Sequence, residues 1–98
     1  MNPDAIILVR FFTTNEGGRK NAIQGNFYGC PLFVGNESFD CRLLLDGKCL
    51  ELGEFYEIPI KFLFPEIALP MIQEGKNVTL WEGKVVATAK IIKILTNI

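Results

Sequence analysis

Histidine is absent from the sequence. Because histidine is the most common general base and a frequent metal ligand, its absence excludes Ser-His and Cys-His nucleophilic sites and all metal sites built on imidazole. The three cysteines, Cys30, Cys41 and Cys49, include no Cys-x-x-Cys pair and are odd in number, so they do not form a disulfide framework. We therefore expect reduced, buried thiols in a cytoplasmic protein, with no metal and no cofactor.

Signals for export, membrane insertion and nucleotide binding are missing too. The N-terminal segment has Asp4 where an export signal has basic residues, and Arg10 interrupts its apolar run. Gly75-Lys76 is followed by Asn77, whereas a phosphate-binding loop needs Ser or Thr directly after the lysine. We expect a chain that enters no membrane and binds no nucleotide.

Charge and composition favour one small binding domain over an enzyme. The 98 residues are 49% hydrophobic and 21% charged, which suits a single domain, residues 1–98, with one core. The acidic residues are scattered, and no spacing singles out a carboxylate pair for acid–base catalysis. The net charge of −1 provides no positive field for nucleic acid, and such near-neutrality favours self-association. We expect a non-enzymatic protein, part of whose apolar excess serves an interface.

Apolar and polar residues alternate over short segments that turn residues separate. Phe39, Cys41 and Leu43 share one face of such a segment, while Ser38 and Asp40 share the other. The spacing predicts an all-β fold, a six- to seven-stranded antiparallel Greek-key barrel or else a sandwich. The apolar segments expected to form or flank strands cover residues 5–13, 27–34, 37–45, 48–52, 54–64, 77–82 and 84–95.

The Asp46-Gly47 turn is the strongest hairpin signal. Asp-Gly tolerates positive φ at both central positions of a type I′ turn, so we expect Leu45 to face Lys48. Alternation further predicts which residues of two strands point inward. These are Tyr56, Ile58, Ile60, Phe62 and Phe64 in one strand, and Val85, Ala87, Ala89 and Ile91 in the other.

Glycine and proline weaken two of the apolar segments. Gly29 and Pro31 predict that residues 27–34 form a bent or edge strand rather than a central one. Pro65, Pro70 and Gly75 interrupt residues 65–76, which predicts a connection with about one helical turn. The apolar residues of this connection are expected to plug one end of the barrel.

Local chemistry singles out two turns as candidate binding sites. Gly17-Gly18-Arg19-Lys20 could cradle a phosphate with backbone N–H groups and two cations, or form an ordinary glycine turn with solvated charges. Trp81 is out of phase with the apolar residues of its strand, so it either stacks on a partner or packs under a loop. Lys84 adds a cation to the turn that follows, and the carboxylate and glycine of that turn are Glu82 and Gly83.

Several segments together resemble the C-terminal barrel domain, the third domain, of elongation factor Tu. Glu-Gly-Gly-Arg at residues 16–19 follows an apolar strand, and residues 82–95 read EGKVVATAKIIKIL, as at the end of that domain. The resemblance implies a six-stranded antiparallel barrel that helps to hold the T-arm of aminoacyl-tRNA and the exchange factor. The positions that match its functional residues are Arg19, Glu82 and Gly83. Between these ends, Leu45, Gly53, residues 56–64 and residues 65–69 follow the family's order.

The chain departs from the family where the family carries basic residues. Its Arg-Pro-Gln-Phe-Tyr-Phe stretch is Gly-Cys-Pro-Leu-Phe-Val here, residues 29–34, so a phosphate contact is missing. Trp81 replaces the arginine before the Glu-Gly turn. We therefore expect a protein partner, a component of translation or a toxin, rather than tRNA. The alternative is an RNA-binding module that uses the residues Arg19, Lys20, Trp81, Glu82, Gly83 and Lys84.

Overall fold

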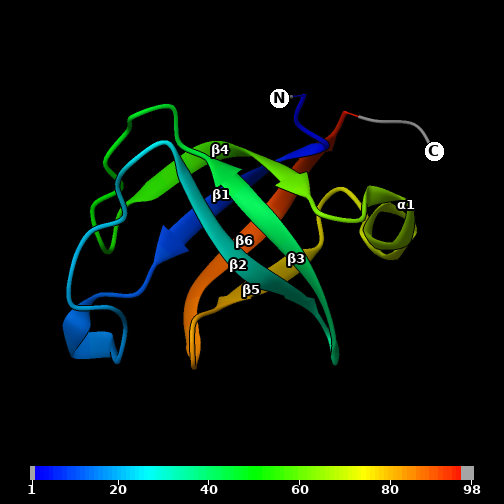
Figure 1. The fold of residues 1–98 in the computed structure, drawn as a ribbon. Coiled ribbons are helices and arrows are strands. Elements are labelled where there is room, and N and C mark those ends of the chain that lie inside the picture. The colour runs from blue at the N-terminus through cyan, green and yellow to red at the C-terminus, as the bar shows by residue number, and fades with distance from the viewer. Residues whose placement is uncertain (1, 96–98) are drawn as a thin grey trace.

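The computed structural model describes residues 2–95 and shows six strands that close into one antiparallel barrel (Figure 1). In chain order the elements are β1 (Ala5–Phe11), η1 (Thr14–Glu16), β2 (Phe27–Val34), β3 (Glu37–Leu44), β4 (Phe55–Phe62), α1 (Pro65–Ala68), η2 (Leu69–Met71), β5 (Asn77–Trp81) and β6 (Val85–Ile94). Around the barrel the strand order is β1-β4-β3-β2-β5-β6. Strand β5 returns to lie beside β2 after the β2-β3-β4 meander, which is a Greek-key connection. The expected all-β barrel is confirmed.

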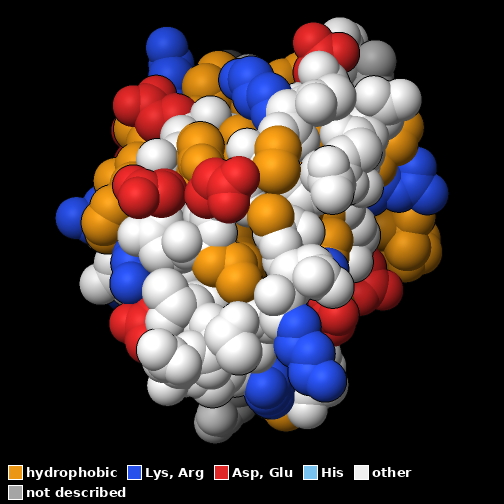
Figure 2. All heavy atoms as spheres, turned by 90° about the vertical axis from the view of Figure 1, so that its left-hand side faces the viewer, with side chains coloured by type: hydrophobic (Ala, Val, Ile, Leu, Met, Phe, Trp, Pro, Cys, Tyr) orange, Lys and Arg blue, Asp and Glu red, His pale blue; other side chains and the backbone are white. Residues whose placement is uncertain are grey.

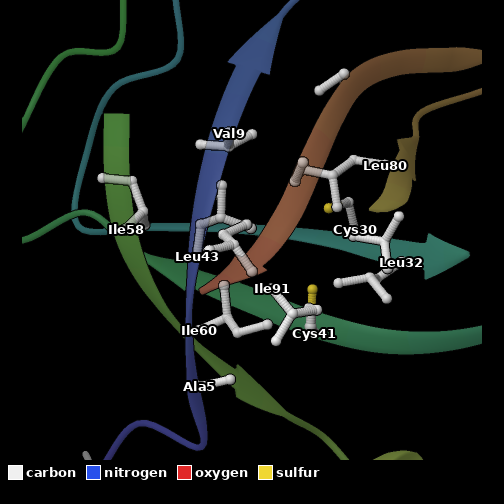
Figure 3. Close-up of a cluster of buried hydrophobic side chains, with 14 of the residues drawn as sticks. Ala5, Val9, Cys30, Leu32, Cys41, Leu43, Ile58, Ile60, Leu80 and Ile91 are labelled. Carbon is white, nitrogen blue, oxygen red and sulfur yellow. The ribbon is translucent and has the colours of Figure 1, made fainter. Parts of the chain in front are cut away.

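The core follows from the two-residue period of the strands. In β1 the alternate residues Ala5, Ile7, Val9 and Phe11 are buried. In β3 the same period buries Cys41 and leaves its neighbours exposed. Figure 3 shows side chains from several strands converging on the barrel interior. Each large apolar side chain buried in this way contributes about 1.5–3 kcal/mol of transfer free energy.

Strand β2 is not an edge strand, so that expectation was wrong. It pairs with β3 along its whole length and with β5 through Leu32 and Phe33. Counting from the hairpin turn, Pro31 occupies a non-hydrogen-bonded position towards β3, and the pairing with β5 begins only at the next residue. The N–H group that proline lacks therefore has no ladder partner to lose, and the closed barrel tolerates Pro31 in a strand with two neighbours.

The Asp46-Gly47 turn forms as expected, but no paired strand follows it. Both residues have positive φ, 53° and 82°, and the Lys48 N–H donates to the Leu45 carbonyl at 3.0 Å. Beyond the turn, Leu50 makes only an isolated bridge with Ile23. Strand β3 already has β2 and β4 on its two sides, so residues 48–52 have no free edge to join.

Two residues expected in the core lie on the surface. Phe64 is 56% exposed because β4 ends at Phe62 and the chain turns into α1. Val85 is 38% exposed and Val86 is buried, because the pairing of β5 with β6 has an irregularity that changes the phase of the strand. The expectation that all cysteines are buried also fails for Cys49, which is exposed in the loop after β3.

The connection after β4 contains the expected helical turn. Elements α1 and η2 bury Ala68 and Leu69, and Ile72 follows them into the interior. Pro65 and Pro70 each stand in the first turn of their element, where a missing N–H group removes no helical bond. One side of this short segment therefore closes the barrel end, as predicted.

The first and last strands meet near Asp4. The Leu95 N–H donates to the Asp4 carbonyl at 2.9 Å, and β1 pairs with β6. The buried Asp4 carboxylate accepts bonds from the Phe62 N–H at 2.9 Å and from Nζ of Lys61 at 3.1 Å. This carboxylate therefore ties β1 to the end of β4.

Candidate functional site

The loop between β1 and β2 is held by a capping box. The Glu16 N–H donates to Oγ1 of Thr13 at 3.2 Å, and the Thr13 N–H donates to Oε1 of Glu16 at 2.8 Å. Arg10 reaches the same carboxylate at 3.1 Å and also donates to the Gly53 carbonyl. The start of the loop is thus fixed before the chain reaches its glycine pair.

The glycine pair is an ordinary turn and not a phosphate cradle. The N–H groups of Gly17 and Gly18 already donate to the carbonyls of Thr14 and Thr13, at 3.0 and 2.9 Å. A Cβ atom on Gly18 would lie 2.3 Å from the carbonyl oxygen of Phe12, so only glycine fits there. The sequence left open a phosphate cradle or an ordinary glycine turn, and this geometry fits the ordinary turn.

Arg19, which follows this turn, meets Glu82 of the β5–β6 turn although 63 residues separate them. Its guanidinium donates to Oε1 of Glu82, and the Tyr28 hydroxyl donates to the same oxygen. The guanidinium carbon also lies 5.3 Å from the centre of the Tyr28 ring, a cation–π contact. Two residues named by the resemblance are thus brought together, and Tyr28 of β2 completes the cluster.

Contacts on the backbone side hold Arg19 in this position. Oγ1 of Thr14 donates to the Arg19 carbonyl at 2.8 Å, and Nε of Arg19 donates to the Asn21 carbonyl at 3.3 Å. Tyr28 is fixed in turn by an edge-to-face contact with Phe11, with ring centres 5.6 Å apart. Contacts with the backbone and with a buried aromatic ring therefore hold the cluster in place.

Burial and charge set the protonation of the cluster. Burial, reinforced by the hydrogen bond to Glu82, raises the pKa of Tyr28 well above its ordinary value. Partial burial opposes the charged form of Arg19, but its contacts with Tyr28 and Glu82 outweigh this effect and raise its pKa. At neutral pH Tyr28 therefore remains a hydroxyl donor and Arg19 a cation. These protonation states suit recognition, because Tyr28 and Arg19 keep their hydrogen-bond donors at neutral pH.

An aromatic pair, of which one member is exposed, adjoins this cluster through Trp81, the residue before Glu82. Trp81 is 39% exposed, and its ring centre lies 5.8 Å from that of Phe33 in β2. Trp81 therefore packs on a neighbouring strand and still offers a face to solvent. We call Arg19, Tyr28, Phe33, Trp81 and Glu82 the Arg19 surface.

The remaining candidate residues border this surface. Gly83 has φ of 71° in the β5–β6 turn, a conformation that favours glycine, and the turn is closed by a bond from the Glu82 N–H to the Lys84 carbonyl at 2.8 Å. Lys20 and Lys84 are exposed, and neither takes part in an ion pair among residues 2–95. The structure therefore brings Arg19 to Glu82 but leaves both lysines at the rim.

Sequence reasoning missed Tyr28 and Phe33. Tyr28 shares the inward phase of Cys30 at the end of β2, and its hydroxyl reaches Glu82 only because the barrel closes. Phe33 has the opposite phase and faces outward, next to β5. Their phases are visible in the sequence, but their partners depend on the β2–β5 register.

Cys30 and Cys41 are directly opposite partners in β2 and β3, and both thiols point into the core (Figure 3). A hydrogen bond with Cys30, together with burial, raises the pKa of Cys41 well above its ordinary value. Because the thiolate is the reactive form, Cys41 is structural, and Cys30 is buried beside it. Within residues 2–95 no three His, Cys, Asp or Glu side chains converge to hold a metal ion.

Charges of both signs are interspersed on the side of the molecule where η1 lies. Figure 2 shows acidic side chains among basic and hydrophobic ones, with no continuous basic field. The one arginine of the Arg19 surface is neutralised by Glu82. Phosphate groups find little unpaired positive charge there. No helix among residues 2–95 is both long and apolar enough to cross a membrane.

Comparison with known proteins adds no family assignment. No protein-family model matches the chain, and no curated protein matches its sequence at a significant level. A functional proposal must therefore stand on the residues and their geometry.

Proposed function

We propose that this chain is a non-enzymatic binding domain that resembles the third domain of elongation factor Tu and uses the Arg19 surface to engage a protein. The partner is a component of translation or a toxin that acts on translation. The observation that carries the proposal is the contact between Arg19 and Glu82, which the resemblance names and the fold brings together.

The make-up of the surface favours a protein over RNA. Tyr, Trp and Arg are the residues that most often dominate protein interfaces, and here all three are fixed by neighbouring side chains. Glu82 is half exposed, so the surface offers a carboxylate where phosphate would have to approach. RNA binding usually needs unpaired cations, and among the described residues in and around this surface Lys20 and Lys84 fit that requirement.

Affinity capture from the source lysate tests the proposal. The wild-type chain is compared with Trp81→Ala and Glu82→Lys, and with Glu57→Lys on the exposed face of β4 as a charge-matched control. We expect a translation component or a toxin-like protein to be captured by the wild type and the control and to be lost with both variants. Capture of neither kind of protein by the wild type contradicts the proposal.

A tRNA titration decides between the two classes of partner. If the alternative holds, the wild type binds tRNA at low salt, its affinity falls steeply with added salt, and Lys20→Ala with Lys84→Ala reduces the slope. Absence of binding at low salt removes the RNA-binding module from consideration.

A further inference from the structure

Strand β3 has a neighbouring strand on both sides for only part of its length. It pairs with β2 from Glu37 to Leu44, but with β4 only from Cys41 to Leu43. After β4 the chain leaves the sheet and turns into α1, as Figure 1 shows. The first residues of β3 therefore form a short open edge beside α1.

The backbone groups of Ser38 point to this open side. The two-residue turn at 35–36 makes its flanking residues a hydrogen-bonded pair, so Ser38, one pair further on, is not bonded to β2. Its N–H and carbonyl groups face the other way, where they have no backbone partner among residues 2–95. Two residues on, the Asp40 carbonyl accepts the Leu63 N–H at 2.9 Å. A donor and an acceptor therefore remain available to a further strand at Ser38.

A groove of about 250 Å³ lies along this edge. Phe64 and Ile67 on its α1 side are 56% and 58% exposed, and Phe39 is partly buried against the core. An apolar side chain placed in the groove would remove this apolar area from water, which is favourable. We call the residues that line it the β3 edge groove; they are Ser38, Phe39, Asp40, Phe64 and Ile67.

The groove carries acidic side chains. Asp40 is exposed within it, and Glu37 and Glu66 are exposed directly before Ser38 and Ile67 in the sequence. None of these three carboxylates takes part in an ion pair among residues 2–95. A partner that carries lysine or arginine beside apolar residues is therefore attracted to the groove, whereas one that carries carboxylates or phosphates is repelled.

The cations on the next strand pair have other partners. Arg42, two residues after Asp40, holds its guanidinium carbon 5.9 Å from the centre of the Phe27 ring. Lys61, which lies opposite Arg42 in β4, donates to the buried Asp4 carboxylate at 3.1 Å. The negative charge of the groove is therefore left for a partner to neutralise.

We propose that the β3 edge groove binds an extended, basic segment of a partner protein, which adds to β3 as an antiparallel strand. Main-chain bonds to Ser38 hold the segment, and the groove selects its side chains. In an antiparallel pair the residue bonded to Ser38 has its side chain on the same face as Ser38 and Asp40, which suits lysine. Its neighbours project to the other face, that of Phe39, which suits apolar residues. The segment thus alternates basic and apolar residues.

Titration of the full chain with a short peptide in which lysine and valine alternate is the first test. We expect saturable shifts of the amide NMR signals of residues 37–40 and 64–67. A peptide with glutamate in place of lysine is the matched control and should bind at least about tenfold more weakly. Equal affinities, shifts confined to other residues or no saturable binding would each overturn the proposal. So would shifts of these signals with protein concentration alone, which would mean that a second copy occupies the edge.

Methylation of the peptide backbone tests strand addition itself. Methyl groups on the lysine nitrogens remove the N–H groups that face Ser38, whereas methyl groups on the valine nitrogens point away from β3. We expect the first peptide to lose about tenfold or more in affinity and the second to bind like the unmodified peptide. Equal losses, or a larger loss for the second peptide, would show that the peptide does not bind as this strand.

Substitution of Ser38 tests the same bonds from the protein side. Ser38→Pro removes the N–H group at the edge, and Pro31 shows that this barrel tolerates proline at a position not bonded to the adjacent strand. We expect a loss of about tenfold in peptide affinity, while Ser38→Ala, which keeps the N–H group, binds like the wild type. Equal affinities of the two variants contradict the proposal, and the methylated peptides decide it whether or not Ser38→Pro folds. The groove shares no residue with the Arg19 surface, so failure here leaves the proposed function standing, and the reverse also holds.

Discussion

The exposed apolar side chains Leu63, Phe64, Ile67 and Met71, which we call the α1 surface, lie on the opposite side of the barrel from the Arg19 surface. The two surfaces differ in how their exposed groups are satisfied. At the Arg19 surface the polar groups bond to one another, and Tyr28 and Arg19 share the carboxylate of Glu82. At the α1 surface large apolar side chains face solvent instead. Internal bonding fixes the shape of the first surface, whereas the second leaves apolar area in contact with water, which is unfavourable. Both surfaces are built on the same barrel.

The largest expected effect separates the core from the α1 surface. Phe62 is 1% exposed and Phe64 is 56% exposed, although residues two positions apart share one face of a continuous strand. We expect Phe62→Ala to lower the free energy of unfolding by about 3–5 kcal/mol, because it leaves a cavity. Phe64→Ala should change it by less than about 0.5 kcal/mol. Urea denaturation at low protein concentration measures both, and equal losses would mean that Phe64 is part of the core.

A substitution that disturbs the backbone of the loop just before Arg19 should have the next largest effect on stability. Gly18→Ala forces a Cβ atom against the Phe12 carbonyl, and we expect a loss of about 2–4 kcal/mol in the free energy of unfolding. Gly29→Ala is the matched control, because the new Cβ atom meets only ordinary contacts. Thermal unfolding of the two variants checks this. A Gly18→Ala protein as stable as the control would show that the loop moves aside at little cost.

Removing the tyrosine hydroxyl tests the polar cluster itself. We expect Tyr28→Phe to cost about 1–2 kcal/mol, the usual range for a hydrogen bond to a charged group that is partly exposed. Glu82→Gln should have a smaller effect after Tyr28→Phe than in the wild-type background, because the two residues act on each other. A double-mutant cycle measured by urea denaturation gives this coupling, and strict additivity would contradict the contact.

The smallest expected effect concerns the capping box and depends on pH. The backbone N–H of Thr13 and then the side chain of Arg10 lower the pKa of Glu16 from its ordinary value of 4.5. A lowered pKa in the folded state stabilises the fold above that ordinary value, and the contribution is lost as pH falls through the folded-state pKa. We expect Glu16→Gln to lower the melting temperature slightly at neutral pH and to have no effect in acid.

Glu57→Gln, on the exposed face of β4, is the control for this experiment and should show a smaller difference at neutral pH. A Glu16→Gln protein that loses the same stability at every pH would mean that the carboxylate acts through packing and not through its charge. Circular dichroism at a series of pH values distinguishes the two outcomes.

Much of the barrel was predictable because alternation is a local property. In β3 the period of two placed Cys41 and Leu43 on one face, and that face is buried; the Asp46-Gly47 turn formed with the expected positive φ. The errors occur where a non-local event changes the phase or ends a strand. The irregular β5–β6 register exchanges Val85 for Val86, and the turn into α1 exposes Phe64.

The candidate site was predictable only in part, for a similar reason. The phase of Trp81 within one strand set it apart from the buried residues, but it left open whether the ring is exposed or covered by a loop. The pairing of Arg19 with Tyr28 and Glu82 depends on barrel closure, which brings β2 next to β5. The resemblance to elongation factor Tu named Arg19 and Glu82 as binding residues, but it gave no reason to expect that they neutralise each other.

The hydrogen bond between Asp4 and Leu95 makes this chain suitable for circular permutation. Because Leu95 is hydrogen-bonded to Asp4, a short linker could join these two residues, and new ends could be opened at Gly35-Asn36. Such a circular permutant keeps every strand pair but turns the β1–β6 pairing into a local contact and the β2–β3 hairpin into a distant one. Its folding rate relative to that of the original chain would then show whether the β1–β6 pair or the β2–β3 pair forms first.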